Sequence, residues 1–152
     1  MPKPPKPPQK KTADSEAKLK RELVPCLEQT MPKSITVRVE DRFRAGIPDI
    51  IHTWSRMTSF IEVKYADPEL TGRDVQWETC MKLAEQGSCW YVIYTRNIVA
   101  GREVLATFVV SPFSLTFPDW RRRARFLSEG HNHQLVAEWF AKLHSGVYKI
   151  DK

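Results

Sequence analysis

The stretch Gly46-Ile47-Pro48-Asp49 is followed by a second one, Phe60-Ile61-Glu62-Val63-Lys64. Glu62 lies thirteen residues after Asp49. The β-branched and aromatic content of the second stretch predicts a strand. Because side chains alternate across a strand, its glutamate and lysine share one face, and its isoleucine and valine enter the core on the other. An apolar run at 47–54 predicts an earlier strand. A hairpin through the polar stretch 55–59 would then set Asp49 beside Glu62.

These residue types point to a cation and a lysine at one place. Two carboxylates without a softer ligand suit a hard cation such as Mg²⁺, which keeps coordination sites for water and phosphate. Lys64 alongside could stabilise or deprotonate an attacking water. The alternative is an ordinary hairpin whose solvated face carries a Glu–Lys pair. The Gly-x-Pro-Asp sequence ahead of it favours a site.

A helix predicted at 14–29, capped by Asp14 or Ser15, adds a further acid. At 100° per residue, Glu16 falls in one stripe with the leucines at 19, 23 and 27. An acid in line with core leucines points inward and needs a partner. It could instead be a surface acid that complements the helix dipole. Pro25 is expected to kink the helix or end it early.

A second helix is predicted at 73–86, with Gly87 as its stop. Gln76 lies on its apolar side together with Cys80 and Leu83. A glutamine there needs hydrogen-bond partners, and a metal-bound water or a phosphate would serve. A core glutamine satisfied by the protein itself is the alternative.

In this order and spacing, the chain resembles the PD-(D/E)xK nuclease superfamily, and most of all the VRR-type nucleases and the small Holliday-junction resolvases of archaea and phages. The resemblance covers roughly residues 14 to 110. It implies an α/β fold of the restriction-endonuclease-like type, a central mixed β-sheet flanked by α-helices. It also implies Mg²⁺, with Mn²⁺ as a substitute, held by Asp49, Glu62 and the backbone carbonyl of Val63. The catalytic set that it implies is Glu16, Asp49, Glu62, Lys64 and Gln76, with Glu16 completing a second metal site or orienting the water.

The activity implied is a Mg²⁺-dependent DNA endonuclease. Hydrolysis needs a positioned water, in-line attack and stabilised charge on phosphate oxygens, and Lys64 fits as base or as electrostatic stabiliser. Branched DNA such as a four-way junction is the first choice of substrate, ahead of duplex, and junction-cleaving relatives imply a homodimer. Two alternatives remain open: a non-catalytic DNA-binding module on the same fold, and a small protein adaptor.

Length and composition limit the remaining possibilities. The chain has 152 residues, 41% of them apolar, which predicts one domain with a sizeable core at 13–152, including a C-terminal helical extension. No apolar run approaches a membrane span, and no secretory signal is evident. The scattered cysteines at 26, 80 and 89 predict buried thiols in a reducing compartment, not a disulfide framework or zinc site. We therefore expect a cytoplasmic protein, associated with a nucleoid or with a phage-infected host, and no membrane partner.

The net charge of +6 is concentrated at the start of the chain. Residues 1–11 carry four lysines, five prolines and no acid, and without those lysines 20 basic residues face 18 acidic ones, a net charge of +2. The segment 1–12 is therefore predicted to be a disordered arm. It could contact phosphates non-specifically, act as a solubilising tail, or recognise a proline-binding partner.

Two groups of arginines stand out in the remaining sequence. Arginines 38, 42 and 44 precede the Gly-x-Pro-Asp sequence, near the entrance of the expected site. Arginines 121, 122, 123 and 125 lie on a predicted short helix whose other side carries Trp120, Ala124 and Leu127. Contact with the DNA backbone is the favoured interpretation, and a structural role or neutralisation by nearby acids is the alternative. The DNA-contacting set is thus Arg38, Arg42, Arg44, Arg121, Arg122, Arg123 and Arg125.

Further strands are predicted at 34–39, 89–95 and 102–110, the last two joined through 97–101. A final helix at 132–144 carries an apolar stripe, Leu135, Val136, Trp139, Phe140 and Leu143, that either completes the core or forms a dimer seam. His131-Asn132-His133 spells an unrelated nuclease motif whose residues are normally far apart. These histidines are instead expected to cap or precede the last helix, and a metal site with His144 is a minor alternative.

Overall fold

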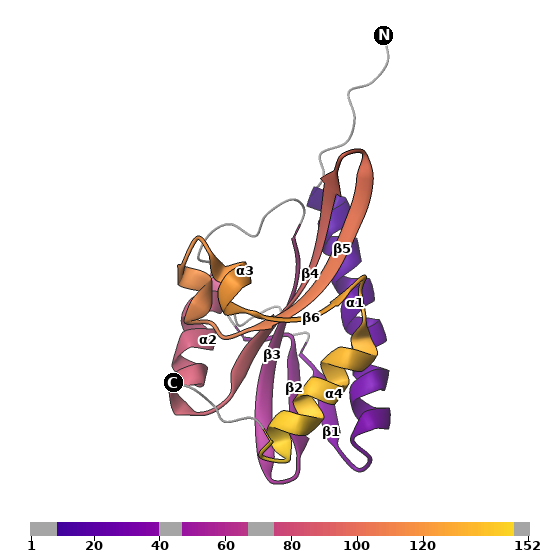
Figure 1. Cartoon of the computed structure of the whole chain (residues 1–152). Coiled ribbons are helices and arrows are strands. Elements are labelled where there is room, and N and C mark those ends of the chain that lie inside the picture. Colours follow the sequence, from indigo (N-terminus) through magenta and orange to yellow (C-terminus); the bar gives the residue numbers. More distant parts are fainter. Residues whose placement is uncertain (1–8, 40–46, 67–74, 148–152) are drawn as a thin grey trace.

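The computed structural model describes residues 9–39, 47–66 and 75–147, with side chains from residue 15 in the first range and from residue 77 in the third. Its elements follow the chain from an N-terminal helix, through a sheet with an inserted helix, to a C-terminal helix (Figure 1). They are α1 (Gln9–Thr30), β1 (Ile35–Arg38), β2 (Ile50–Trp54), β3 (Met57–Ala66), α2 (Val75–Gln86), β4 (Cys89–Val99), β5 (Arg102–Val110), η1 (Ser114–Thr116), α3 (Trp120–Arg123), β6 (Arg125–Glu129) and α4 (His133–His144).

The six strands form one mixed sheet whose spatial order is the order of the chain, β1-β2-β3-β4-β5-β6. β3 and β4 are parallel, and every other neighbouring pair is antiparallel. Parallel neighbours need a long crossover, and α2 lies in the chain between these two strands. The predicted α/β fold with a central mixed sheet flanked by helices is therefore confirmed.

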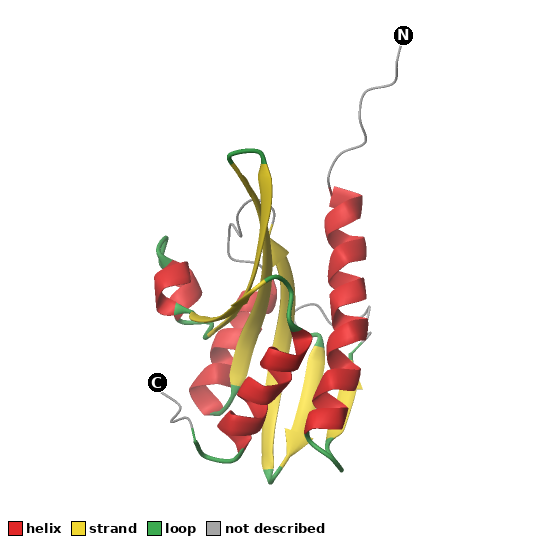
Figure 2. Cartoon of the chain, turned by 45° about the vertical axis from the view of Figure 1, so that its right-hand side comes forward, coloured by secondary structure: helices red, strands yellow, loops and turns green. Residues whose placement is uncertain are grey.

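Helices cover both faces of the sheet (Figure 2). α1 and α4 pack together over one face, on a core that contains Ile61, Val63 and Val92. α2 covers the other face, where Tyr91 and Ile93 are buried, and Trp120 of α3 joins the same cluster. Neighbouring residues of one strand thus enter opposite cores, as the predicted alternation requires.

α1 differs from the expected helix at both ends. It begins at Gln9, inside the segment assigned to the N-terminal arm, and continues through Pro25 to Thr30. An interior proline costs a helix about 3 kcal/mol. The leucines at 19, 23 and 27 lie on one stripe of α1 and are 6%, 0% and 0% exposed. Their burial against the sheet and α4 offsets the cost of the proline, so the expected early ending is wrong. Residues 1–8 lie outside the described residues.

The connection between β2 and β3 is shorter than the predicted polar stretch 55–59. The turn consists of Ser55 and Arg56, both with positive φ (53° and 65°), and β3 begins at Met57. Two left-handed residues match the right-handed twist of a tight hairpin. The polar residues after the turn therefore belong to the strand, where Ser59 is buried.

The hairpin of β4 and β5 is longer than predicted. Its strands pair from Tyr91–Val110 as far as Val99–Arg102, and Ala100 and Gly101, with φ of 51° and 77°, form the turn. Residues 96–99, which lay outside the predicted strand, belong to β4 and extend the ribbon. It projects beyond the rest of the sheet (Figure 1).

α4 completes the core against α1, which settles the choice between core and dimer seam for most of its stripe. Val136, Phe140 and Leu143 are at most 3% exposed. Asn132 caps the helix by accepting a hydrogen bond from the Leu135 N–H at 3.0 Å. Leu135 itself is 36% exposed, so its assignment to the buried side is wrong. As the residue after the first two helical positions, it lies beside the stripe and not in it.

The three cysteines are free thiols, as predicted. Cys80 and Cys89 are buried, whereas Cys26 is only partly buried. Separately, none of the helices in the described ranges is long and apolar enough to cross a membrane.

Candidate functional site

β3 continues past the end of its partner β2, and this leaves backbone groups to be satisfied. The last β2–β3 pair is Ile50–Ile61, whereas β3 continues to Ala66. The Val63 N–H donates to Asp49 Oδ2 at 2.9 Å, and the Tyr65 N–H donates to Glu16 Oε1 at 3.2 Å. Carboxylates from the residue before β2 and from α1 thus replace the missing strand. The same hydrogen bonds fix both acids at this edge of the sheet.

Asp49 and Glu62 lie side by side, as the predicted hairpin required. Asp49 immediately precedes the Ile50–Ile61 pair, so the antiparallel register places it opposite Glu62. The Glu62 side chain is on the α2 side of β3 and is only 2% exposed. This burial rules out the alternative of a solvated face with an exposed Glu–Lys pair.

The two carboxyl groups share a hydrogen bond, and the proton belongs to Glu62. Burial, followed by the hydrogen bond and negative charge of Asp49, raises the pKa of Glu62 well above its ordinary value. Burial alone would also raise the pKa of Asp49. Hydrogen bonds from Glu62, the Val63 N–H and Lys20 outweigh it and lower that pKa. At neutral pH the pair therefore carries one negative charge instead of two.

One oxygen of this pair lacks a hydrogen-bond partner. Glu62 Oε2 is buried and has no hydrogen-bond partner among the described residues. A buried polar atom without a partner costs roughly 1–3 kcal/mol, so native structures rarely retain one. A ligand that binds oxygen, such as a hard cation, would remove this penalty.

Lys20 belongs to the site, although the sequence reasoning did not select it. Its Nζ lies 3.2 Å from Asp49 Oδ1, and the two side chains are only 22% and 19% exposed. Lys20 follows Glu16 by four residues, one turn of α1, so both side chains reach the same edge of the sheet. That helical spacing was the available signal for it.

Glu16 and Lys64 complete the described part of the site. Glu16 is half-buried, as its inward stripe predicted, and burial raises its pKa against the opposing effects of the Tyr65 hydrogen bond and Lys64. Lys64 is half-buried and interacts electrostatically with both Glu16 and Glu62. The structure therefore brings together Glu16, Asp49, Glu62 and Lys64. Gln76 lies in the first turn of α2, and its side chain is outside the described residues.

The predicted basic surface divides into separate pieces. Arg38 is a half-buried residue of β1, while positions 42 and 44 lie outside the described residues. The single helix predicted for the second group is wrong. α3 is one turn long and ends at Arg123, and Arg125 and Leu127 belong to β6. The break follows from packing, because Trp120 and Ala124 sink into the core on the α2 side and the chain then joins the sheet edge.

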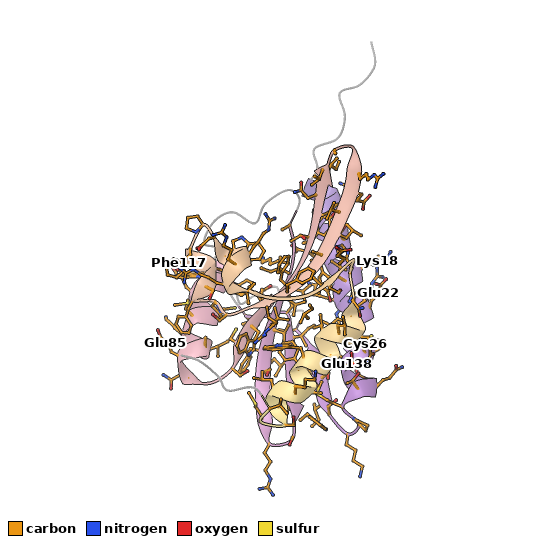
Figure 3. The ribbon with its side chains drawn as sticks, viewed as in Figure 1. Lys18, Glu22, Cys26, Glu85, Phe117 and Glu138 are labelled. Atoms are coloured by element: carbon orange, nitrogen blue, oxygen red, sulfur yellow. The ribbon has the colours of Figure 1, made fainter. Side chains whose placement is uncertain are left out.

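Arginines of α3 are partly engaged by their neighbours. Arg123 pairs with Asp119 at 3.1 Å and lies 3.7 Å from the centre of the Phe117 ring. Arg121 lies 5.3 Å from the Trp120 ring centre. Figure 3 shows Phe117 on the opposite side of the molecule from Lys18 and Glu22 of α1. The helices α3 and α1 therefore lie on different sides of the molecule (Figure 1).

The histidines near α4 have structural partners. His131 Nε2 donates to the Thr95 carbonyl at 2.9 Å, and His133 contacts Glu22 and the Tyr94 hydroxyl at 2.8 Å each. His144 makes its contacts elsewhere, with Ser59 and Trp54. In the part of the chain that the structure describes, no three His, Cys, Asp or Glu residues converge on a metal position. A metal at Asp49 and Glu62 would thus need backbone, water or phosphate oxygens as its other ligands.

A groove of about 470 Å³ lies on the other flank of α1. Its lining includes Lys18, Glu22, Tyr65, Arg96 and His131, but neither Asp49 nor Glu62. Tyr65 connects the two places, because its N–H holds Glu16 while its side chain lines the groove.

Comparison with known proteins identifies no relative of this chain. No family model, no curated protein and no solved structure matches the chain. The functional assignment therefore depends on the site itself.

Proposed function

We propose that this protein is a metal-dependent DNA endonuclease with a restriction-endonuclease-like core of the PD-(D/E)xK type. The observation that carries the proposal is the buried Asp49–Glu62 pair, with Glu62 Oε2 lacking a partner, at an edge that also gathers Glu16 and Lys64. Buried acids with strongly displaced pKa values, next to lysines, are typical of catalytic sites. The mixed sheet with α1 on one face and α2 on the other supplies the scaffold that such a core requires.

The residues present fit Mg²⁺ or Mn²⁺. Asp49 and Glu62 offer hard oxygen ligands at one point, the unsatisfied Glu62 oxygen gains a partner, and the backbone carbonyl of Val63 belongs to the strand residue between Glu62 and Lys64. Such an ion, when bound, polarises a phosphate and lowers the pKa of a bound water. Glu62 must release its proton to serve as a ligand.

The remaining residues act on the water and the phosphate. Lys64, which interacts electrostatically with Glu16 and Glu62, either stabilises negative charge on the phosphate as an ammonium or, as the neutral amine, accepts a proton from the attacking water. Glu16, fixed by the Tyr65 N–H, orients that water from the α1 side or contributes to a second metal site. Gln76, whose helix packs on the Glu62 side of the sheet, is assigned to holding the water or the phosphate.

For the substrate we propose branched DNA, cut by a homodimer that pairs two sites. The exposed Arg122 and Arg125, with their neighbours Arg121 and Arg123, supply phosphate contacts on the α2 side. With Lys20 and Lys64 at the sheet edge, basic groups then reach the substrate from two sides, which suits a bent or branched DNA better than one straight duplex.

A non-catalytic module is the second candidate, and a specific observation favours it. Asp49 and Glu16 already satisfy two N–H groups of β3, and Lys20 neutralises Asp49. A cluster that only completed a sheet edge would look the same in these contacts. The unsatisfied Glu62 oxygen has no role in such a cluster, and for that reason we prefer the nuclease.

The test is cleavage of a labelled four-way junction, a Y-fork, a linear duplex and a single strand, each with Mg²⁺ or with EDTA. The wild type is compared with Asp49→Ala and with Glu85→Gln, a change at an exposed position of α2 (Figure 3). We expect Mg²⁺-dependent cutting that Asp49→Ala abolishes and Glu85→Gln leaves intact. Binding to DNA without cutting would support the non-catalytic module. Neither binding nor cutting would favour a protein adaptor.

A further inference from the structure

Lys20 places a positive charge directly beside Asp49. Its ammonium contacts Asp49 Oδ1 at 3.2 Å, while Asp49 Oδ2 is taken by the Val63 N–H at 2.9 Å. Each oxygen of Asp49 thus accepts one hydrogen bond, and the one at Oδ1 comes from an ammonium. A divalent cation that binds Asp49 competes with this ammonium for the same carboxylate.

We propose that the Lys20 ammonium is the counter-ion of Asp49, that a divalent cation displaces this ammonium, and that the ammonium then binds a DNA phosphate. The inference rests on the proposed function and assigns Lys20 as a positioning residue that couples metal loading to substrate binding. Without DNA, a displaced ammonium would remain close to the incoming cation and repel it. With DNA, a phosphate oxygen accepts the ammonium, and the repulsion ends.

The position of Lys20 on α1 makes this exchange feasible. Its side chain is partly exposed (22%), so the head group can leave Asp49 without crossing the core. A flexible four-carbon stem and a compact charge allow the ammonium to reach a second partner from the same backbone position. Lys64 already interacts with Glu16 and Glu62 and is therefore not available to replace Lys20 at Asp49.

Thermodynamic reciprocity gives the proposal a distinctive signature. If DNA removes Lys20 from competition, then DNA must tighten metal binding, and metal must tighten DNA binding by the same factor. A neutral residue at position 20 would remove the competition from the start. Such a variant would bind metal more tightly than the wild type in the absence of DNA, yet would bind DNA less tightly than the wild type once metal is bound. A lysine that only stabilises the fold would produce neither change.

The experiment measures Mn²⁺ binding to the DNA-free protein through the loss of the free-ion electron paramagnetic resonance signal. The variants are Lys20→Gln, Lys20→Met and Lys20→Arg. Lys18→Gln is the matched control, because Lys18 lies half a turn away on α1 with a side chain 69% exposed. We expect Lys20→Gln and Lys20→Met to bind Mn²⁺ about tenfold more tightly, since a unit charge at this distance in a partly buried site changes ion binding by at least that factor. Lys20→Arg and Lys18→Gln should match the wild type.

DNA binding provides the second readout. In Mn²⁺-free buffer with EDTA, the neutral Lys20 variants should bind a junction as tightly as the wild type does. At saturating Mn²⁺ they should cleave it more slowly. Under those conditions the salt dependence of DNA binding should be weaker by about one phosphate contact. Unchanged or weaker Mn²⁺ binding in both neutral variants would overturn the role proposed for Lys20 but not the metal site. Absence of Mn²⁺ binding in the wild type, or equal binding by Asp49→Ala, would overturn the metal site and with it the proposed function. Thermal melts identify a variant that fails to fold, and the second neutral variant then decides.

Discussion

The β2–β3 hairpin carries a buried polar cluster at each end, and the two clusters are built differently. Next to the turn, His52 contacts Thr36 Oγ1 at 2.7 Å and Met31 Sδ at 3.1 Å. Its neighbour His144, with ring centres 5.2 Å apart, donates to the Trp54 carbonyl at 2.8 Å and accepts from Ser59 at 2.7 Å. Both nitrogens of both rings have a partner.

The other end of the same hairpin is incomplete. There Glu62 lies beside Asp49, and its Oε2 atom is buried without a hydrogen-bond partner among the described residues. Both clusters are buried and both have displaced pKa values, so burial and titration do not distinguish them. Completeness does, because a network that satisfies every member is sufficient as structure, whereas one that leaves a buried oxygen over is poised for a ligand.

The largest expected effect separates catalysis from stability at Glu62. Glu62→Gln should leave the melting temperature at pH 7 unchanged or raised, since the glutamine resembles the protonated acid that the fold already holds. Cleavage should fall by about a thousandfold, because a ligand that stabilises the transition-state charge contributes several kcal/mol. Thermal melts and single-turnover cleavage measure the two quantities. A fall in melting temperature with cleavage retained would show that Glu62 has a structural role and no catalytic one.

The histidine end should respond to pH. Burial, and then the charge of His144, lowers the pKa of His52 to about 4, from 6.5 in the unfolded chain. The unfolded state therefore binds more protons between pH 6.5 and pH 4, so the free energy of unfolding falls as the pH is lowered through that window, by about 3 kcal/mol in total. Glu62 acts with the opposite sign, because a raised pKa favours folding at low pH.

That opposition dictates how the measurement is made. Urea unfolding from pH 7.5 to pH 4.5 should show a steeper loss of stability in Glu62→Gln than in the wild type. In His52→Gln the stability should stay level or rise as the pH is lowered, because the contribution of Glu62 remains. Equal slopes in the wild type and His52→Gln would show that His52 is not held neutral by the fold.

His144→Ala should cost stability and leave the chemistry alone. It removes the acceptor of Ser59 and the donor to Trp54 from a buried network, which costs about 2–3 kcal/mol. Cleavage per folded molecule should stay within about twofold of the wild type, measured at a temperature where both are folded. A loss of cleavage larger than the loss of folded protein would show that the histidine cluster affects the chemistry at the other end of the hairpin.

These two clusters also show what the sequence could predict. Glu62 and Asp49 were identified because alternation along a strand and a hairpin offset are local rules, and the register followed from them. Lys20 required the helix and the sheet edge to be placed against each other, which no local pattern specifies. His52 and Ser59 gave no signal, since their partners come from Met31, Thr36 and His144, up to 85 residues away.

Element boundaries failed for a related reason. Pro25 would end a helix in isolation, yet the leucines around it gain enough from α4 and the sheet to continue the helix. Arg125 continues the arginine run of α3 in sequence, but backbone pairing with Val109 places it in β6. In both cases tertiary contacts outweigh the local preference.

The smallest expected effect is the most direct evidence for an incomplete cluster. Because Asp49 and Glu62 share one proton at neutral pH and a divalent cation needs both carboxylates ionised, Mn²⁺ binding should release about one proton. Calorimetric titrations at pH 7 in buffers of different ionisation enthalpy give that number from the slope of the observed enthalpy. Glu62→Gln should release none, and His144→Ala should release as many as the wild type, since the contacts of His144 are with Ser59 and Trp54 and not with the Asp49–Glu62 pair. A wild type that binds Mn²⁺ without releasing a proton would place the ion elsewhere, and Glu62 would then be a protonated acid that serves the fold.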